Sequence, residues 1–145
     1  MSEDNSWKPI AAAFGLLLAI AFGGYQYQRL QTPPDDEWFV VRVIEHPGVV
    51  VVKFGADWCP PCRAMHHELA QLKGRHLAGV SIVEIDVDKK PELARHYGVS
   101  SIPRTLLFVD GSFRTGITGS RSADELAAWI EPYRDADTAT SVATR

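Results

Sequence analysis

Cysteine is scarce in this chain, which has only two cysteines among 145 residues. Two cysteines cannot form the disulfide network that holds small secreted scaffolds together, so the fold must depend on a hydrophobic core. An excess of one charge is also lacking, because 15 basic and 18 acidic residues leave a net charge of −3. This balance gives no electrostatic reason to expect nucleic-acid binding. Apolar residues make up 46% of the chain, which is enough for a packed core.

Charged residues are missing altogether between Lys8 and Arg29. The apolar stretch 9–28 would be about 30 Å long as a helix, enough to cross a bilayer. A cleaved signal peptide is the alternative, because Ala19-Ile20-Ala21 has the small-x-small form of a cleavage site. A buried core helix fits less well, since the stretch has no polar face. We therefore expect a tail, a single-pass membrane anchor and a linker, at residues 1–8, 9–28 and 29–35.

The orientation of such an anchor is only weakly encoded. Lys8 lies on one side of the stretch, and Arg29 and Arg42 lie on the other. A short tail before one span and a folded domain after it favour an anchor whose N-terminus stays inside the cell. We therefore expect the domain on the extracytoplasmic side, which is the periplasmic side in a bacterium.

The rest of the chain predicts an α/β domain over 36–134, followed by a polar, disordered tail over 135–145. Apolar runs and turn signals predict strands over 49–55, 80–86, 105–109 and 112–118. Capping residues and helical spacing predict helices over 36–46, 60–73, 91–97 and 122–133. A helical crossover makes the first two strands parallel, and a hairpin makes the last two antiparallel. The result is a central mixed sheet with helices on both faces.

Two local features sharpen this fold prediction. The helix over 36–46 has Trp38, Val41 and Ile44 near one face, so we expect these three side chains to be buried. Asp110-Gly111 is a two-residue hairpin signal between the last two strands.

Both cysteines fall in the run Trp58-Cys59-Pro60-Pro61-Cys62, between an apolar strand and a helix. A Cys-x-x-Cys at such a junction indicates a site of dithiol–disulfide exchange. The free N–H groups and partial positive charge of a helix N-terminus stabilise a thiolate on the first cysteine. The three-residue step lets the second sulfur reach the first, so the pair can close and reopen.

The chain from about Asp36 to Tyr133 resembles thioredoxins, and more loosely the membrane-tethered thioredoxin-like proteins of bacterial envelopes. The resemblance implies a thioredoxin fold and a thiol–disulfide oxidoreductase. The matching residues are dispersed through the domain and are Phe54, Ala56, Trp58, Cys59, Pro61, Cys62, Arg63, Asp88, Pro91, Tyr97, Gly98, Val99, Ile102, Pro103, Leu106, Leu107, Phe108, Gly111 and Gly119.

The resemblance also implies a role for each residue around the cysteines. Cys59 would be the partly exposed nucleophile, and the more buried Cys62 would resolve the mixed disulfide. Pro103 would be a cis proline beside the sulfurs, where the backbone of Ile102 could pair with an extended client segment. Trp58 and Ile102 would form the apolar contact surface of the site.

The two residues between the cysteines favour a reductase. Pro60 departs from the commoner glycine, stiffens the loop and removes one N–H that could have faced the sulfur. Pro61 stands where oxidants of this superfamily usually carry histidine. We therefore expect the catalytic domain to reduce disulfides in client proteins without a bound cofactor. Its electrons would come from a membrane reductant system or a reductase.

Three charged residues near the motif depart from the family pattern. Relatives bury an acid at the position of Lys53 and pair it with a lysine at the position of Glu84, so the signs are exchanged here. A lone buried charge is very costly, which favours a swapped pair. Either Lys53 or Glu84 would relay the proton of Cys62. Alternatively, one or both side chains would reach solvent and play no part in catalysis. Arg104 would either favour the thiolate or lie on the surface.

Two other functions remain open. A redox-coupled chaperone or assembly factor would use the surface around Trp58 and Pro103 to hold clients. A metal chaperone would bind zinc or copper through Cys59, Cys62 and one of the histidines that follow, His66 or His67. The Pro-Pro spacer and the thioredoxin landmarks favour redox chemistry, so we expect no metal.

Overall fold

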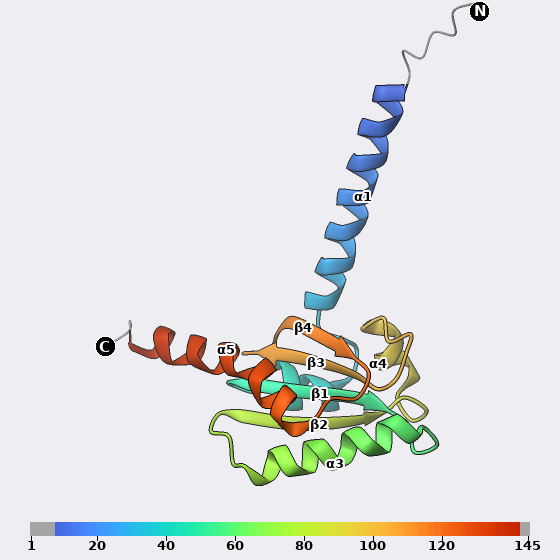
Figure 1. The fold of residues 1–145 in the computed structure, drawn as a ribbon. Helices are drawn as coiled ribbons and strands as arrows, with labels where there is room; N and C mark the ends of the chain where they lie inside the picture. Colours follow the sequence, from blue (N-terminus) through green and yellow to red (C-terminus); the bar gives the residue numbers. More distant parts are fainter. Residues whose placement is uncertain (1–7, 143–145) are drawn as a thin grey trace, which may run out of the picture. The chain divides into compact units, whose positions relative to one another are not determined.

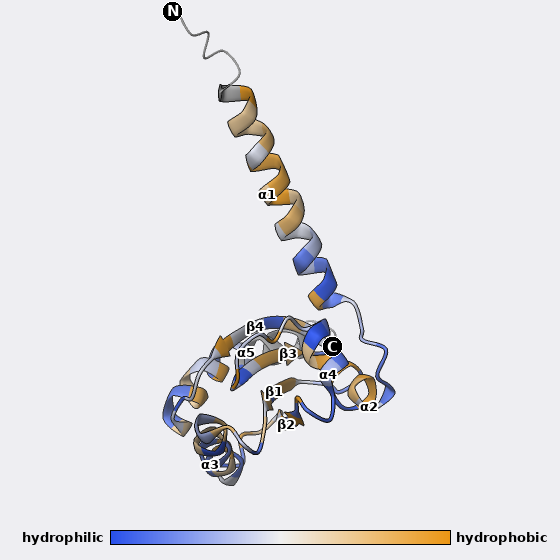
Figure 2. Ribbon diagram, turned by 90° about the vertical axis from the view of Figure 1, so that its right-hand side faces the viewer, coloured by the Kyte–Doolittle hydropathy of each residue, from blue (hydrophilic) through white to orange (hydrophobic). Residues whose placement is uncertain are grey.

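The structure is a computed structural model that describes residues 8–142, with side chains described for residues 10–134. The chain divides into two compact units between Thr32 and Pro33. The first unit is α1 (Lys8–Gln31), whose surface is apolar over most of its length (Figure 2). Its segment Ile10–Gln31 has a mean hydropathy of 1.5 and is long and apolar enough to cross a membrane.

The linker is shorter than the sequence suggested. We expected it to begin at residue 29, but the helix continues to Gln31, and the Thr32 hydroxyl donates to the Gln28 carbonyl at 3.0 Å. The helix stops short of Pro33-Pro34, because proline has no N–H and disfavours helical backbone in the residue before it. Residues 1–7 of the predicted N-terminal tail lie outside the described residues.

The second unit is built on a four-stranded sheet in the order β2-β1-β3-β4 (Figure 1). The strands are β1 (Val49–Gly55), β2 (Val80–Asp86), β3 (Arg104–Val109) and β4 (Ser112–Thr118). β1 pairs parallel with β2 and antiparallel with β3, and β3 pairs antiparallel with β4. This is the predicted mixed sheet, and its central strand β1 is buried along its whole length.

The turn between β3 and β4 is the predicted hairpin. Asp110 and Gly111 both have positive φ, at 47° and 74°. Glycine is required at the second position for a further reason, since a Cβ there would collide with the Ile44 carbonyl. The Asp110 carboxylate accepts a hydrogen bond from the Gly48 N–H at 2.9 Å, which ties the turn to the start of β1.

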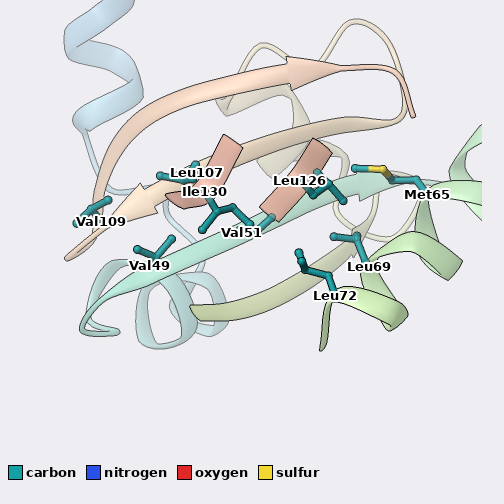
Figure 3. Packing of buried hydrophobic residues seen from close by; sticks show 9 residues of the cluster. All are labelled: Val49, Val51, Met65, Leu69, Leu72, Leu107, Val109, Leu126 and Ile130. Carbon is teal, nitrogen blue, oxygen red and sulfur yellow. The ribbon is translucent and has the colours of Figure 1, made fainter. Parts of the chain in front are cut away.

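One face of the sheet is covered by α3 (Pro60–Gly74) and α5 (Ala123–Val142). The side chains between the helices and this face are aliphatic, apart from a methionine (Figure 3). They are Val49, Val51, Met65, Leu69, Leu72, Leu107, Val109, Leu126 and Ile130. We call this the aliphatic face.

The opposite face is covered by α2 (Glu37–Phe39), η2 (Val40–Ile44) and α4 (Pro91–His96). Aromatic rings fill this side, which we call the aromatic face. The ring of Phe108 on β3 lies 5.8 Å from Phe39 and 5.5 Å from Tyr97, centroid to centroid. Phe39 and Tyr97 are themselves 5.2 Å apart, so the three rings contact one another.

The predicted buried side of the first domain helix is wrong. Trp38 and Val41 are 38% and 56% exposed, whereas Phe39 and Val43 are fully buried. Phe39 rather than Trp38 faces the sheet, where its ring contacts those of Phe108 and Tyr97. The prediction depended on spacing alone, and spacing does not say which side of a helix the rest of the domain covers. After Phe39 the backbone forms a π-helix, and the Glu45 N–H bonds to the Val40 carbonyl.

The prediction of a disordered tail from residue 135 is also contradicted up to Val142, because α5 continues to that residue. The prediction used the polar composition after Tyr133, but a helix needs no apolar face to satisfy its own backbone hydrogen bonds. Pro132 lies inside this helix. Residues 143–145 lie outside the described part of the chain.

Candidate active site

The two cysteines lie at the N-terminus of α3, just after the carboxyl end of β1. Cys59 is the N-cap residue of the helix, and it forms a disulfide with Cys62 across a Cα–Cα distance of 5.2 Å. The Cys62 N–H also points at the Cys59 sulfur, at 3.3 Å. Pro60 and Pro61 occupy the two helical positions in between and have no N–H. Of the first three helical positions, therefore, only Cys62 can donate to the Cys59 sulfur.

Both cysteines are buried in this disulfide state. Cys59 is 4% exposed and Cys62 is 1% exposed. The expected order of burial is correct, but the expected partial exposure of Cys59 is not. Its side chain is turned back over the helix start towards Cys62 and packs in a small apolar cluster with Ala56, Val87 and Ile102.

The loop before β3 lies against this cluster. The Ile102–Pro103 peptide bond is cis, as the resemblance implied, and the Ile102 side chain packs against the cysteines. The Pro103 carbonyl accepts a hydrogen bond from the Gly119 N–H at 2.9 Å, which joins the loop to the end of β4. The structure thus brings Ile102 and Pro103 to the cysteines from a distant part of the sequence.

Trp58 is the exposed apolar residue of the site, with 66% of its surface accessible. Its indole Nε1–H donates to the Asp88 carboxylate at 2.8 Å. The sequence analysis assigned Asp88 no role of its own in the site. The two residues are thirty positions apart, and no local pattern connects them.

Lys53 and Glu84 face each other on neighbouring strands, as their register on β1 and β2 requires. The Lys53 ammonium lies 3.2 Å from Glu84 Oε2. The Lys53 side chain is 10% exposed and that of Glu84 is 23% exposed. The exchanged signs therefore form a direct ion pair, with the cation on the buried central strand and the carboxylate on the edge strand.

Gly55 shows how close Lys53 comes to Cys62. A Cβ at Gly55 would lie 3.2 Å from the Lys53 ammonium nitrogen and 3.2 Å from the Cys62 Cβ. The two groups are thus separated by little more than the space of one missing methyl group. Glycine at this position leaves room for the lysine beside the second cysteine.

Glu84 has two further partners, both basic residues on α3. His66 Nδ1 lies 2.8 Å from Glu84 Oε2, and the Lys73 ammonium lies 3.4 Å from Glu84 Oε1. Burial raises the pKa of Glu84, but the hydrogen bonds from His66 and Lys53 outweigh burial and hold the pKa below its usual value. Glu84 is therefore ionised at neutral pH and balances the charge of Lys53.

His66 and Lys73 are the residues of this cluster that the sequence analysis missed. His66 was considered only as a metal ligand, and Lys73 was not considered. A signal was present, because Cys62, His66, Leu69 and Lys73 follow helical spacing along one side of α3. Which strand residue that side meets depends on packing, which the spacing does not give.

Arg104 lies away from this cluster. Its guanidinium donates to the Thr118 hydroxyl at 2.8 Å, and these residues are direct partners on β3 and β4. Of the two interpretations of Arg104, this exposed contact favours the surface one, and the contact also joins the two hairpin strands.

An open cavity of about 410 Å³ lies beside α3, between the ends of β1 and β2. Its lining includes Cys62, Lys53, Glu84 and His66. Within residues 8–142, no group of three or more His, Cys, Asp or Glu side chains is arranged to hold a metal ion. The ring of His66 bonds to the Glu84 carboxylate through Nδ1.

Comparisons with known proteins identify the family of this domain. The thioredoxin family model matches residues 32–132. The chain is 34% identical over 96 residues to thioredoxin C-2 of Corynebacterium nephridii, covering 66% of this chain and 89% of the relative. It is 32% identical over 99 residues to thioredoxin M4 of Arabidopsis thaliana chloroplasts, covering 68% of this chain but only about half, 51%, of that protein.

A solved structure agrees with these relatives. A mutant thioredoxin from Halobacterium salinarum superposes with a TM-score of 0.62 at 31% identity, covering 68% of this chain and 86% of that one. The matched region contains the sheet, the cysteine pair and the cis-proline loop described above. The chain belongs to the thioredoxin family and carries a thiol–disulfide oxidoreductase centre at Cys59 and Cys62.

Proposed function

We propose that this protein reduces disulfide bonds in client proteins. The observation that supports this direction is the pair of prolines at the start of α3. A strongly oxidising dithiol needs a well-stabilised thiolate, because stabilising the reduced form raises the reduction potential. Here Pro60 and Pro61 leave the Cys62 N–H as the single donor from the first three helical positions to the Cys59 sulfur. The Cys59 thiolate is accordingly stabilised only modestly.

The reaction has two exchange steps. The Cys59 thiolate attacks one sulfur of the client disulfide and forms a mixed disulfide, while the other client sulfur leaves as a thiolate. Cys62 then loses its proton and attacks the Cys59 sulfur. The second client sulfur leaves as a thiolate, and the protein retains the Cys59–Cys62 disulfide. The client gains two electrons, which the protein must recover from a reductase or a membrane electron donor.

Lys53 and Glu84 support the second step. Cys62 is the more buried cysteine, and a buried thiolate is costly unless a cation lies nearby. Lys53 is that cation, and Glu84 supplies its countercharge at 3.2 Å. The pair thus favours the Cys62 thiolate by its charge, whereas the sequence analysis expected one of its members to relay the proton.

Client proteins bind at the exposed indole of Trp58 and along the loop Ile102–Pro103. An extended client segment adds to the backbone of Ile102 by short β-pairing. The same surface supports the second candidate, a redox-coupled chaperone or assembly factor, because Trp58 is 66% exposed in a domain whose other large apolar residues are mostly buried. A C59S/C62S double variant distinguishes the two: a reductase loses its cellular activity, and a chaperone keeps it.

The apolar helix α1 anchors the protein in a lipid bilayer by a single pass, with the catalytic domain on the extracytoplasmic side. Its length and hydropathy support the anchor. The expected results are that α1 is retained in the protein extracted from membranes and that protease added to spheroplasts reaches the domain. A mature protein that begins after Ala19-Ile20-Ala21, within α1, would show instead that this segment is a signal peptide.

The decisive experiment is the reduction potential of the Cys59–Cys62 pair. The full chain in detergent is equilibrated with glutathione or dithiothreitol buffers, and free thiols are trapped by alkylation. We expect a potential near that of thioredoxin, about −270 mV. A potential of about −120 mV, the value of a strong dithiol oxidant, would reverse the proposed direction of electron flow and make the protein a disulfide donor.

A further inference from the structure

The buried Cys62 thiol needs a group that accepts its proton. Cys62 is 1% exposed, so its proton cannot pass directly to bulk water. Lys53, the nearest cation, has three donors and no acceptor while it is charged. Glu84 is held ionised by its cationic partners and is a weak base at neutral pH. The two members of the ion pair therefore stabilise the thiolate charge better than they accept the proton.

His66 is the remaining base beside this pair. It follows Cys62 by four residues on α3, and its side chain is 58% exposed. Because a carboxylate can only accept, the 2.8 Å contact with Glu84 requires the proton on His66 Nδ1. In the neutral ring this leaves the lone pair on Nε2. Glu84 thus fixes the form of the imidazole in which Nε2 can accept a proton.

The cavity supplies the connection. Cys62, Lys53, Glu84 and His66 all line the same open space of about 410 Å³. One water occupies about 30 Å³ of liquid, so the space is large enough for several waters in contact with these polar groups. A proton can therefore travel from the Cys62 sulfur to the His66 ring along hydrogen-bonded water.

We propose that His66 is the proton acceptor for Cys62 in the resolving step and that it acts through water in this cavity. The inference depends on the exchange reaction proposed above. The Cys62 S–H bond breaks, its proton passes through water to His66 Nε2, and the thiolate attacks the Cys59 sulfur. The client sulfur leaves with the electron pair of the mixed disulfide. His66 then releases its proton to solvent, and no further oxidant or reductant is needed.

Charged or titratable residues surround His66 on each neighbouring element. The strands contribute Lys53 from β1 and Glu84 and Asp86 from β2. The loops after these strands contribute Asp57 and Lys89, and α3 itself contributes Arg63, His67 and Lys73. Lys89 pairs with Asp86, and the Arg63 guanidinium donates to the Asp57 carbonyl. Of these residue types, histidine and cysteine ordinarily titrate between about pH 6 and 9. A pH profile of the resolving step therefore reports on His66, His67 and Cys62.

The test separates the two exchange steps. Reduced full-length protein in detergent is mixed rapidly with dithiobis(nitrobenzoate), an aromatic disulfide whose released thiolate absorbs visible light. The first equivalent of thiolate reports attack by Cys59, and the second reports attack by Cys62. Both rates are measured across the neutral pH range for wild type, H66N and H67N. Asparagine at position 66 keeps an N–H that can donate to Glu84 but lacks the ring nitrogen that accepts.

For wild type we expect the second rate to rise with pH across the neutral range. H66N should slow this phase by about tenfold at neutral pH and shift its rise to higher pH, with the first phase unchanged. H67N, which changes the neighbouring histidine in the same cavity, should behave as wild type. An H66N profile that matches wild type, or an H67N profile that changes in the same way, would overturn the inference. A wild-type protein that releases no second equivalent would instead overturn the proposed function.

Discussion

The two faces of the sheet are equally well buried but are built differently. The aliphatic face packs valine, leucine, isoleucine and methionine against α3 and α5. The aromatic face packs Phe39, Tyr97 and Phe108 against one another beneath α2, η2 and α4. Only the first includes a buried charge, because Lys53 follows Val49 and Val51 along the same side of β1.

This difference separates stability from chemistry. The helix that carries both cysteines covers the aliphatic face, so a charge placed there lies beside the redox pair. A change on the aromatic face affects packing without altering the charges around Cys62. The comparison therefore predicts that aromatic substitutions change the free energy of unfolding alone, whereas substitutions in the Lys53–Glu84 pair change both unfolding and exchange.

The largest expected effect comes from F108A on the aromatic face. Phe108 is fully buried and contacts the rings of Phe39, Tyr97 and Phe113, so its loss leaves a cavity. We expect the free energy of unfolding to fall by about 3–5 kcal/mol. Urea unfolding of the oxidised protein measures this change, and the reduction potential should remain at the wild-type value.

L107A is the matched variant on the aliphatic face. Leu107 is the neighbour of Phe108 on β3 and is equally buried. L107A should lower the free energy of unfolding by about 2–5 kcal/mol and leave the reduction potential unchanged, because it removes packing and no charge. A potential that moves with F108A but not with L107A would contradict the separation between the two faces.

An intermediate effect is expected for E84Q, which removes the charge that balances Lys53. At neutral pH the free energy of unfolding should fall by about 1–2 kcal/mol, since the lysine is left without a countercharge in a mostly buried position. Because folding lowers the pKa of Glu84, its stabilisation is complete above the unfolded value of about 4.3 and is lost as the pH falls through the folded value. In E84Q the free energy of unfolding should therefore fall less steeply at low pH than in wild type. E84Q should also slow the attack of Cys62 on the Cys59 sulfur.

Urea unfolding at a series of acidic and neutral pH values checks this prediction. E131Q is the control, because it removes the same charge from an exposed pair with Arg134 on α5. It should change stability by less than about 0.5 kcal/mol. An E84Q protein with the acid slope and resolving rate of wild type would show that the ion pair has no part in either property.

The smallest effect should be a gain, from Y97F on the aromatic face. Tyr97 is 4% exposed, and its hydroxyl has no hydrogen-bond partner among the described residues. Removing an unsatisfied buried hydroxyl relieves a desolvation cost, so the free energy of unfolding should rise by about 1 kcal/mol. A loss of stability in thermal or urea unfolding would mean that the hydroxyl is satisfied in solution.

The strands could be predicted from the sequence almost residue for residue. A continuous apolar run marks β1, alternating apolar and polar residues mark β2, and the Asp110-Gly111 turn fixes where the hairpin begins. The cysteine pair could be placed at the start of α3 for the same reason, since Pro60 and Pro61 can only occupy the first turn of a helix. These features are local, and local chemistry determines them.

Features that depend on packing were not predictable in this way. Trp38 and Val41 lie on the surface although their spacing suited a buried helical face, because Phe39 and Val43 are the residues that pack against the domain. The contacts of Trp58 with Asp88 and of His66 with Glu84 join residues thirty and eighteen positions apart. Such pairs become visible only when the strands and helices are placed beside one another.

The ion pair between Asp36 and Lys90 gives one carboxylate two tasks. Asp36 is the N-cap of α2, where its carboxylate accepts from the Phe39 N–H, and its other oxygen lies 2.6 Å from the Lys90 ammonium. Lys90 directly precedes α4, so a single side chain joins the starts of two helices that lie far apart in the sequence. Loss of this carboxylate would release both helix starts at once.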